Sequence, residues 1–157
     1  PPVPGPPLVR TEPMWEEPRV LVVRIDHPLA GRDSVSIADT ADEIFITVGS
    51  GPADVVNWWV VDPRPDGSHP RRGPTADSVE GLLELVAAGA GVNIAGESAA
   101  HRYRREELAF VRIDDIPPAR IHLLSSKDVH SPIIESFRAV ARELSPLGDD
   151  GEPKSAV

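Results

Sequence analysis

The pattern of apolar and polar positions is clearest over Thr75–Ala100, where it predicts a helix, a glycine stop, a short buried strand and a second helix. Five apolar residues recur at helical spacing and share one face: Val79, Leu82, Leu83, Val86 and Ala87. Burying each large aliphatic member contributes ~1.5–3 kcal/mol, which outweighs the ~1 kcal/mol cost of Gly81 within the helix. Asp77 and Glu80 have capping-box spacing and predict where the helix starts, and the apolar run Val92–Ala95 is the strand.

Similar patterns elsewhere predict an alternation of strands and helices. Strands are expected at Leu8–Pro13, Arg19–Ile25, Glu43–Val48, Arg72–Ala76, Leu108–Ile113 and Arg120–Leu124. Helices are expected after Ser36, over Ala53–Trp59, and after Ser131, where proline occupies the first helical position. This alternation is typical of an α/β protein with open βαβ layers, in which ligands collect at the ends of strands.

Composition and charge narrow the classes of function. The chain has 157 residues, which suits one domain or a large fragment of a two-lobed domain. A net charge of −9 argues against direct binding to nucleic acid or to an anionic membrane. The sequence has no cysteine, which excludes disulfides, zinc–thiolate sites and cysteine nucleophiles. No apolar run approaches the ~18 residues of a membrane span, so we expect a cytoplasmic protein. Because the first residue is Pro1, we expect a processed chain or a piece of a longer one.

Four blocks, in order, resemble the effector-binding domain of LysR-type transcriptional regulators. The first is RTEPMWEEPRVLVVRIDHPLAGRDSVSIADTADEIFI, which contains the recurrent HPLA and an ADTAD helix start. The second is the loop DPRPDG, which follows a pair of tryptophans. The third is TADSVEGLLELVAAGAGVNIAGESAA, with Ala95-Gly96 where the family more often has proline. The fourth is ARIHLLSSKDVHSPIIESFRAVARE, similar to the return strand and closing helix.

The resemblance implies an α/β fold of the periplasmic-binding-protein type II kind, with one complete lobe plus a remnant of the other. The expected parts are a linker at 1–7, the end of lobe one and a hinge at 8–24, lobe two at 25–118, the return strand and helix of lobe one at 119–145, and a disordered tail at 146–157. The family's N-terminal winged helix-turn-helix has no counterpart here. We therefore expect DNA contact only through a missing N-terminal domain, and exposed apolar faces on Arg120–Leu124 and the last helix.

In the family, a small effector lies in a cleft between the lobes. By position, the lobe-two wall would consist of Thr47, Val48, Gly49, Ser50, Gly51, Asn93 and Ala95. The residue types are consistent with ligand binding, because a Gly-Ser-Gly loop before a helix offers N–H groups and a hydroxyl to an anion. The alternative is an ordinary turn with a helix cap. Asn93 interrupts an apolar strand, so its side chain either faces the cleft or is buried and hydrogen-bonded to backbone.

The residues around Ser98 raise the alternative of a serine hydrolase. Gly96–Ala100 imitates the G-x-S-x-G nucleophile elbow around Ser98, with His122 and His130 downstream. The final glycine and an HGGG-type oxyanion loop are missing, so we interpret Ser98 as a helix cap and expect no enzyme. The five histidines show no ligand spacing, and we expect neither a metal nor a cofactor.

The sequence thus predicts the small-molecule effector-sensing part of a LysR-type regulator, with a carboxylate as a candidate effector. The resemblance implies a homo-oligomer in which the effector shifts the population of lobe arrangements. Two alternatives stay open. One is a stand-alone small-ligand-binding module of periplasmic-binding-protein type, and the other is a truncated remnant acting only by hetero-association.

Overall fold

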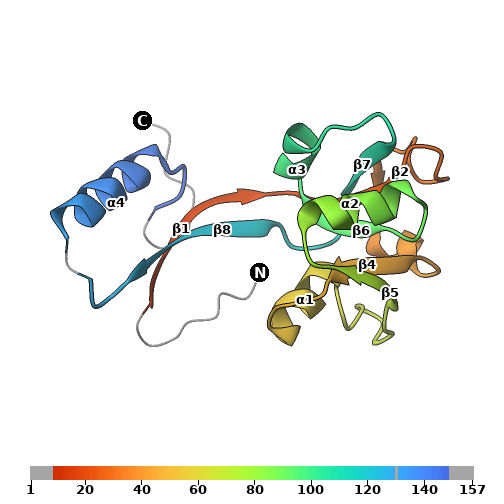
Figure 1. The fold of residues 1–157 in the computed structure, drawn as a ribbon, viewed down its shortest axis with the longest axis horizontal. Helices are drawn as coiled ribbons and strands as arrows, with labels where there is room; N and C mark the ends of the chain where they lie inside the picture. Colours follow the sequence, from red (N-terminus) through yellow and green to blue (C-terminus); the bar gives the residue numbers. More distant parts are fainter. Residues whose placement is uncertain (1–8, 130, 149–157) are drawn as a thin grey trace. The chain divides into compact units, whose positions relative to one another are not determined.

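A computed structural model describes residues 9–129 and 131–148 (Figure 1). Two compact units divide them: the first comprises residues 18–118, and the second joins residues 9–17 to residues 119–148. The predicted linker at 1–7 lies outside the described residues. Within the described part, no helix is both long and apolar enough to cross a bilayer.

The first unit contains a mixed sheet. Four strands hydrogen-bond in the order β3 (Ser34–Val35), β7 (Leu108–Ile113), β2 (Arg19–Arg24) and β6 (Asn93–Gly96). The parallel pair β4 (Ile44–Val48) and β5 (Arg71–Ala76) extends this sheet, because Ile46 N–H donates to Val92 O and Val92 N–H donates to Ile44 O, each at 2.8 Å. As predicted for a strand buried on both faces, the first five residues of β2 are buried. Because β2 belongs to this sheet, the unit begins nearer the N-terminus than the expected boundary at residue 25.

Helices connect these strands and cover the sheet. They are the 3₁₀ turn η1 (Ile37–Thr40), α1 (Ala53–Val60), α2 (Val79–Ala87) and the short α3 (Ser98–Arg102). Side chains from β2, β4, β6 and β7 form one apolar cluster with Val60 of α1. A second cluster places Leu82, Leu83 and Val86 of α2 against Ile46. The apolar face predicted for α2 is therefore the face that packs, although Val79 at its start is 43% exposed.

The start of α2 corrects one sequence prediction. Asp77 and Glu80 do not form its capping box; Ser78 is the N-cap, and its hydroxyl accepts a hydrogen bond from Gly81 N–H at 3.0 Å. Ser78 has the extended backbone that an N-cap needs, so a serine one position later outcompetes the aspartate. The box predicted after Ser36 is present, with reciprocal bonds between Ser36 and Asp39.

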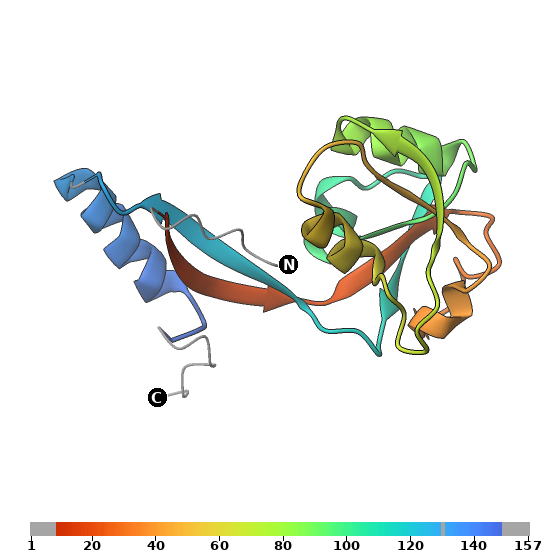
Figure 2. The same cartoon turned by 90° about the horizontal axis from the view of Figure 1, so that it is seen from below.

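The second unit is an antiparallel ribbon carrying one helix. Figure 2 shows β1 (Val9–Glu17) running beside β8 (Ala119–Ser126), with α4 (Pro132–Leu144) at one end. β1 continues beyond Pro13, where its predicted strand ended, because a bulge between Pro13 and Trp15 accommodates the proline without breaking the ladder. Ser131 precedes α4 as its N-cap with Pro132 at the first turn, although no side-chain bond caps the helix.

An ion cluster ties α4 to the ribbon. The Glu12 carboxylate accepts hydrogen bonds from Arg138 Nε and Arg142 Nε, both at 2.7 Å, and the Arg138 side chain is 3% exposed. These guanidinium groups lower the pKa of Glu12 to about 2, the Arg138 bond being the largest cause and burial opposing it.

The chain stays packed past the end of α4, because Ser145 and Leu147 are also buried. Residues 149–157 of the predicted tail lie outside the described residues.

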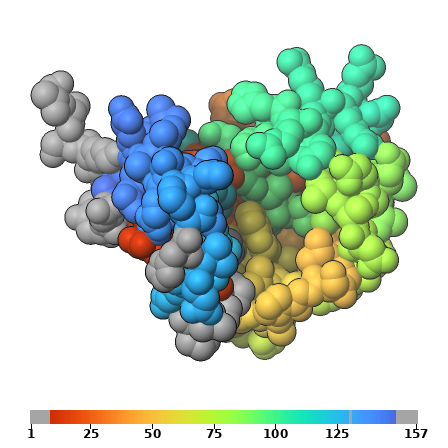
Figure 3. Space-filling view, turned by 60° about the vertical axis from the view of Figure 1, so that its left-hand side comes forward, coloured from red at the N-terminus to blue at the C-terminus, as the bar shows by residue number. Residues whose placement is uncertain are grey.

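The opposite face of α4 is uncovered. Its apolar side chains are exposed, at 80% for Ile133, 62% for Phe137 and 79% for Leu144, and Leu124 of β8 is 51% exposed. In Figure 3 the blue surface of α4 stands open to solvent on the side that faces the viewer. The exposure expected for the last helix and its strand is therefore present.

Candidate functional site

An apolar cavity of about 320 Å³ opens in the first unit at the carboxyl ends of β4 and β6. These are the strand ends at which open α/β sheets bind ligands. Its walls are the end of β4, the start of α1, one side of α2, strand β6 and α3. The lining residues are Thr47, Val48, Ser50, Gly51, Val55, Val56, Trp59, Val60, Val79, Leu82, Leu83, Asn93, Ile94, Ala95, Gly96, Ala99 and Tyr103. Among these described residues none carries a charge.

Six of the seven residues predicted for the effector wall line this one cavity: Thr47, Val48, Ser50, Gly51, Asn93 and Ala95. Gly49 does not. Its N–H donates to Ala76 O at 2.8 Å, and a Cβ at this position would lie 2.9 Å from the Asp77 carboxylate. Gly49 therefore faces the loop before α2, where it lets β4 and that loop approach closely.

Two polar side chains of the cavity lining, Asn93 and Thr47, lie on strands. Asn93 Nδ2 donates to Ile46 O at 2.9 Å, so the second of its two sequence interpretations, a buried amide bonded to backbone, describes its amide nitrogen. Thr47 is 8% exposed and lines the cavity.

Arg19 fixes the helix that forms the opposite wall. It is 2% exposed, its Nη2 donates to Trp58 O at 2.7 Å and to Trp59 O at 2.6 Å, and its guanidinium lies 4.0 Å from the centroid of the Trp58 ring. Burial lowers the pKa of Arg19 to about 10, which leaves it protonated at neutral pH. The side chain thereby satisfies carbonyls at the end of α1 and sets the position of Trp59.

Most of the residues that sequence reasoning missed come from helices. Val55, Val56 and Trp59 of α1, Val79 of α2 and Tyr103 after α3 all line the cavity. One signal was available: α1 is apolar everywhere except on the side that carries Asp54 and Asn57, which is more than one face against a sheet requires. Which of those residues would face a cavity depends on packing between helices, which spacing along one helix does not reveal.

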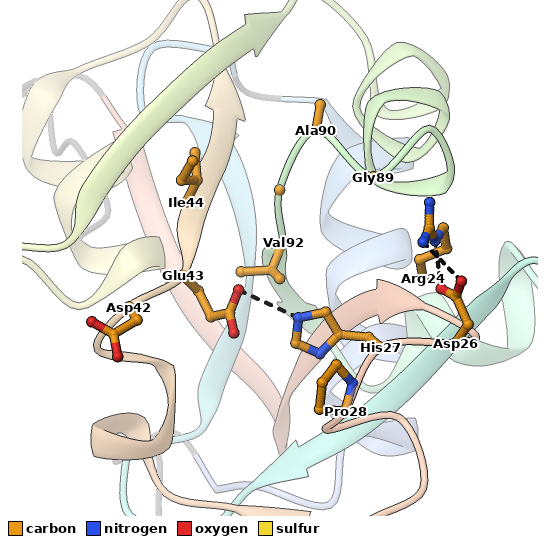
Figure 4. A pocket seen from close by; sticks show the side chains of 11 residues that line it. Arg24, Asp26, His27, Pro28, Asp42, Glu43, Ile44, Gly89, Ala90 and Val92 are labelled. Atoms are coloured by element: carbon orange, nitrogen blue, oxygen red, sulfur yellow. Dashed lines mark hydrogen bonds and ion pairs between the residues drawn. The ribbon is translucent and has the colours of Figure 1, made fainter.

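A second cavity, of about 290 Å³, lies at the opposite ends of the same strands (Figure 4). Four of its polar side chains are paired with one another, and Asp42 is the fifth ionisable side chain of the lining. His27 Nε2 points to Glu43 at 3.3 Å, and Arg24 pairs with Asp26, whose carboxylate accepts from Arg24 Nη2 at 2.7 Å. His27 Nδ1 accepts the Leu29 N–H at 3.2 Å, which directs the other ring nitrogen to Glu43. These two pairs satisfy four of the polar side chains of the wall without a ligand.

The Ser98 arrangement lacks the geometry of a nucleophile elbow. Glu97, not Ser98, is the N-cap of α3, and its backbone is helical, so the interpretation of Ser98 as a cap is wrong. Val61 is the single non-glycine residue with positive φ in the described part, so Ser98 is not on the strained turn that exposes such a nucleophile. His122 belongs to the second unit, and His130 lies outside the described residues.

No group of three or more histidine, aspartate or glutamate side chains within residues 9–129 and 131–148 is placed to hold a metal ion.

Solved structures share this fold. The effector-binding domain of QuiR in complex with shikimate is 24% identical, with a TM-score of 0.72 over 91% of this chain and 68% of that one. The BenM effector-binding domain with its effector benzoate is 20% identical, with a TM-score of 0.73 over 89% of this chain and 64% of that one. OxyR from Corynebacterium glutamicum is 26% identical, with a TM-score of 0.67 over 90% of this chain and 44% of that one. The chain therefore has the type II periplasmic-binding-protein fold of effector-binding domains, in part.

Sequence comparison agrees. The HTH-type transcriptional regulator CysL of Bacillus subtilis (strain 168) is 27% identical over 130 residues, which is 81% of this chain and 41% of CysL. The chain thus spans less than half the length of this relative. A family model described as the LysR substrate binding domain matches residues 1–146, and the chain belongs to that family of regulator effector-binding domains.

Proposed function

We propose that the cavity at the ends of β4 and β6 binds the small-molecule effector of a LysR-type regulator, and that the predicted wall residues contact it. The observation that carries this proposal is the convergence of Thr47, Ser50 and Asn93, from two separate segments, on one apolar cavity. A ligand with an apolar or aromatic body suits walls built from Trp59, valines and leucines.

A carboxylate is the effector class that we propose. The free polar groups at the rim are hydroxyls and the first N–H groups of α1, which a helix leaves without internal partners. Pro52, the N-cap of α1, makes no side-chain capping bond to them. A carboxylate would accept from these groups and from the Thr47 and Ser50 hydroxyls, although Asp54 in the same turn competes for the positive end of the helix.

The test uses benzoate with benzamide as its uncharged match. Thermal melts of the full chain should show stabilisation by benzoate that exceeds that by benzamide, and the double variant Thr47→Val, Ser50→Ala should lose most of it. Thr11→Val, an exposed threonine of the second unit, is the control and should respond as the unchanged chain does. Benzoate binding that survives the double variant would remove the cavity from consideration as the carboxylate site.

We also propose that the chain has no catalytic activity and that its parent contacts DNA through a separate domain, as a cytoplasmic homo-oligomer. Family membership supports the regulatory role. The exposed apolar side chains of α4 support association with another polypeptide. Ester hydrolysis lost on Ser98→Ala would refute the non-enzymatic assignment, and a monomer at all concentrations in light scattering would refute the oligomer.

A further inference from the structure

Arg64 is a buried cation without a partner. Its side chain comes from the loop between α1 and β5, and the residue is 7% exposed. Both Nη atoms are buried and, within the described part of the chain, neither makes a hydrogen bond. Burial, the largest cause, lowers the pKa of Arg64, yet a guanidinium stays protonated at neutral pH. An unpaired buried charge is costly to retain, so its presence calls for a counter-ion.

The surroundings of Arg64 do not supply that counter-ion. The guanidinium carbon lies 4.8 Å from the centroid of the Phe45 ring, a contact that supplies no acceptor to the two buried Nη atoms. Arg19 and Arg72 act on it as like charges. Asp62 and Asp66 attract it, but among the described residues no carboxylate lies within ion-pairing distance of it.

A cavity of about 200 Å³ adjoins this side chain and shares no lining residue with the cavity at the ends of β4 and β6. This volume far exceeds the ~30 Å³ that one water occupies in the liquid. Apolar residues of two segments form much of its lining: Ile37, Ala38, Ala41, Pro65 and Pro70.

The other polar groups of the lining already have partners. The Ser68 hydroxyl donates to Asp66, His69 Nδ1 is bonded to Asp62, and Asp115 accepts the Ile37 N–H at 2.7 Å. Arg64 is therefore the lining side chain whose buried donors lack an acceptor among the described residues.

We propose that this cavity is a second ligand site, which binds a small monocarboxylate through Arg64. The guanidinium fork matches the two oxygens of a carboxylate, and the prolines and alanines accept a short apolar substituent. The carboxylates of Asp66 and Asp115 at the same cavity disfavour a dianion such as phosphate.

Entry of the ligand requires a local movement. Since both Nη atoms are closed off from water, residues 64–68 must shift to let a carboxylate reach them. Two backbone bonds, Arg64 N–H to Ser68 O at 2.8 Å and Gly67 N–H to Arg64 O at 2.9 Å, close this turn on itself. The turn can therefore move as one piece without breaking a strand.

The test is an NMR titration of the ¹⁵N-labelled full chain with propionate, compared with phosphate and chloride at equal ionic strength. We expect saturable shifts at Ala38, Ala41 and Ser68 with propionate and weaker ones with phosphate. Arg64→Met should abolish them, whereas Thr47→Val, which alters the effector cavity, should leave them unchanged. Arg104→Met, an exposed arginine of the same unit, is the matched control.

The apo variant gives an independent readout. Because Arg64→Met replaces an unpaired buried cation with an apolar chain of similar length, the ligand-free variant should melt at the same temperature as the unchanged chain or higher. A melting temperature at least 10 °C lower would mean that the guanidinium has an internal partner, and would overturn the proposal. Absent or non-saturable propionate shifts in the unchanged chain, or shifts retained in Arg64→Met, would also overturn it.

Discussion

Gly91→Ala should destabilise the first unit at the joint between β4 and β6. A Cβ on residue 91 would lie 2.3 Å from Ile44 O and 3.1 Å from the Ile44 carbonyl carbon. Both atoms are backbone, so no rotamer change relieves the overlap, and β4 or the 89–92 turn must move. That carbonyl accepts the Val92 N–H at 2.8 Å, and the neighbouring bond from Ile46 N–H to Val92 O depends on the same register.

The loss of stability in Gly91→Ala has two causes, the steric overlap and the weakened backbone hydrogen bonds. Forced displacement in a packed interior costs about 1–3 kcal/mol, and weakening two backbone hydrogen bonds adds about 1–2 kcal/mol. The free energy of unfolding should therefore fall by about 2–5 kcal/mol, a large share of the ~5–15 kcal/mol typical of a domain. Urea unfolding followed by far-ultraviolet circular dichroism measures it.

Gly31→Ala is the matched control, because a Cβ there meets nothing within 4 Å. Its unfolding free energy should stay within about 0.5 kcal/mol of the unchanged chain. Equal stability of Gly91→Ala and Gly31→Ala would refute the reasoning, since it would mean that β4 and β6 are not joined through this close approach.

Three further results are expected. Ser78→Ala should lower the unfolding free energy by ~1 kcal/mol through loss of the α2 cap, whereas Asp77→Ala should change it little, as urea titration of both would show. Because the pKa of Glu12 is depressed from 4.5 to about 2, the stability that it contributes is present above pH 4.5 and is lost as the pH falls towards 2. Glu12→Gln lacks that contribution at every pH, so the acid midpoint of its α4 helicity should lie at higher pH than in the unchanged chain; an equal or lower midpoint would refute this account. Phe137→Asp should lower the light-scattering mass at high concentration without lowering the melting temperature, because that ring is 62% exposed; an unchanged mass would exclude the α4 face as the site of association.

The sequence predicted the type of most elements because the main cores use strong local patterns. The β-branched run of β2 and the spaced leucines of α2 identify their buried positions without tertiary information. Boundaries were less accurate where neighbouring residues compete, as with Ser78 against Asp77, or where a partner strand accommodates Pro13.

The candidate site was predictable in part for a similar reason. Thr47, Ser50 and Asn93 follow or interrupt strands, and polar residues at such places stand out in a sequence. Gly49 was predicted for the same wall but does not line this cavity, because the direction of a glycine in a loop depends on what packs against it, here Asp77. The burial of Arg64 could not be predicted from the sequence at all. The composition of its loop is typical of a solvent-exposed turn, and the guanidinium is buried because it packs over Phe45 in the folded structure.

The absence of charged side chains from the lining of the effector cavity, among the residues that the structure describes, affects how binding should respond to salt. Contacts with hydroxyls and apolar walls involve no fixed charge for salt to screen. The attraction of the α1 helix end for a carboxylate, about 0.3–1 kcal/mol, is therefore the part of the affinity that should weaken between 0.01 M and 1 M salt, a range over which the Debye length falls from ~30 Å to ~3 Å. In a regulator that binds its metabolite mainly through such contacts, the fraction of occupied sites depends on the concentration of the metabolite much more than on the ionic strength.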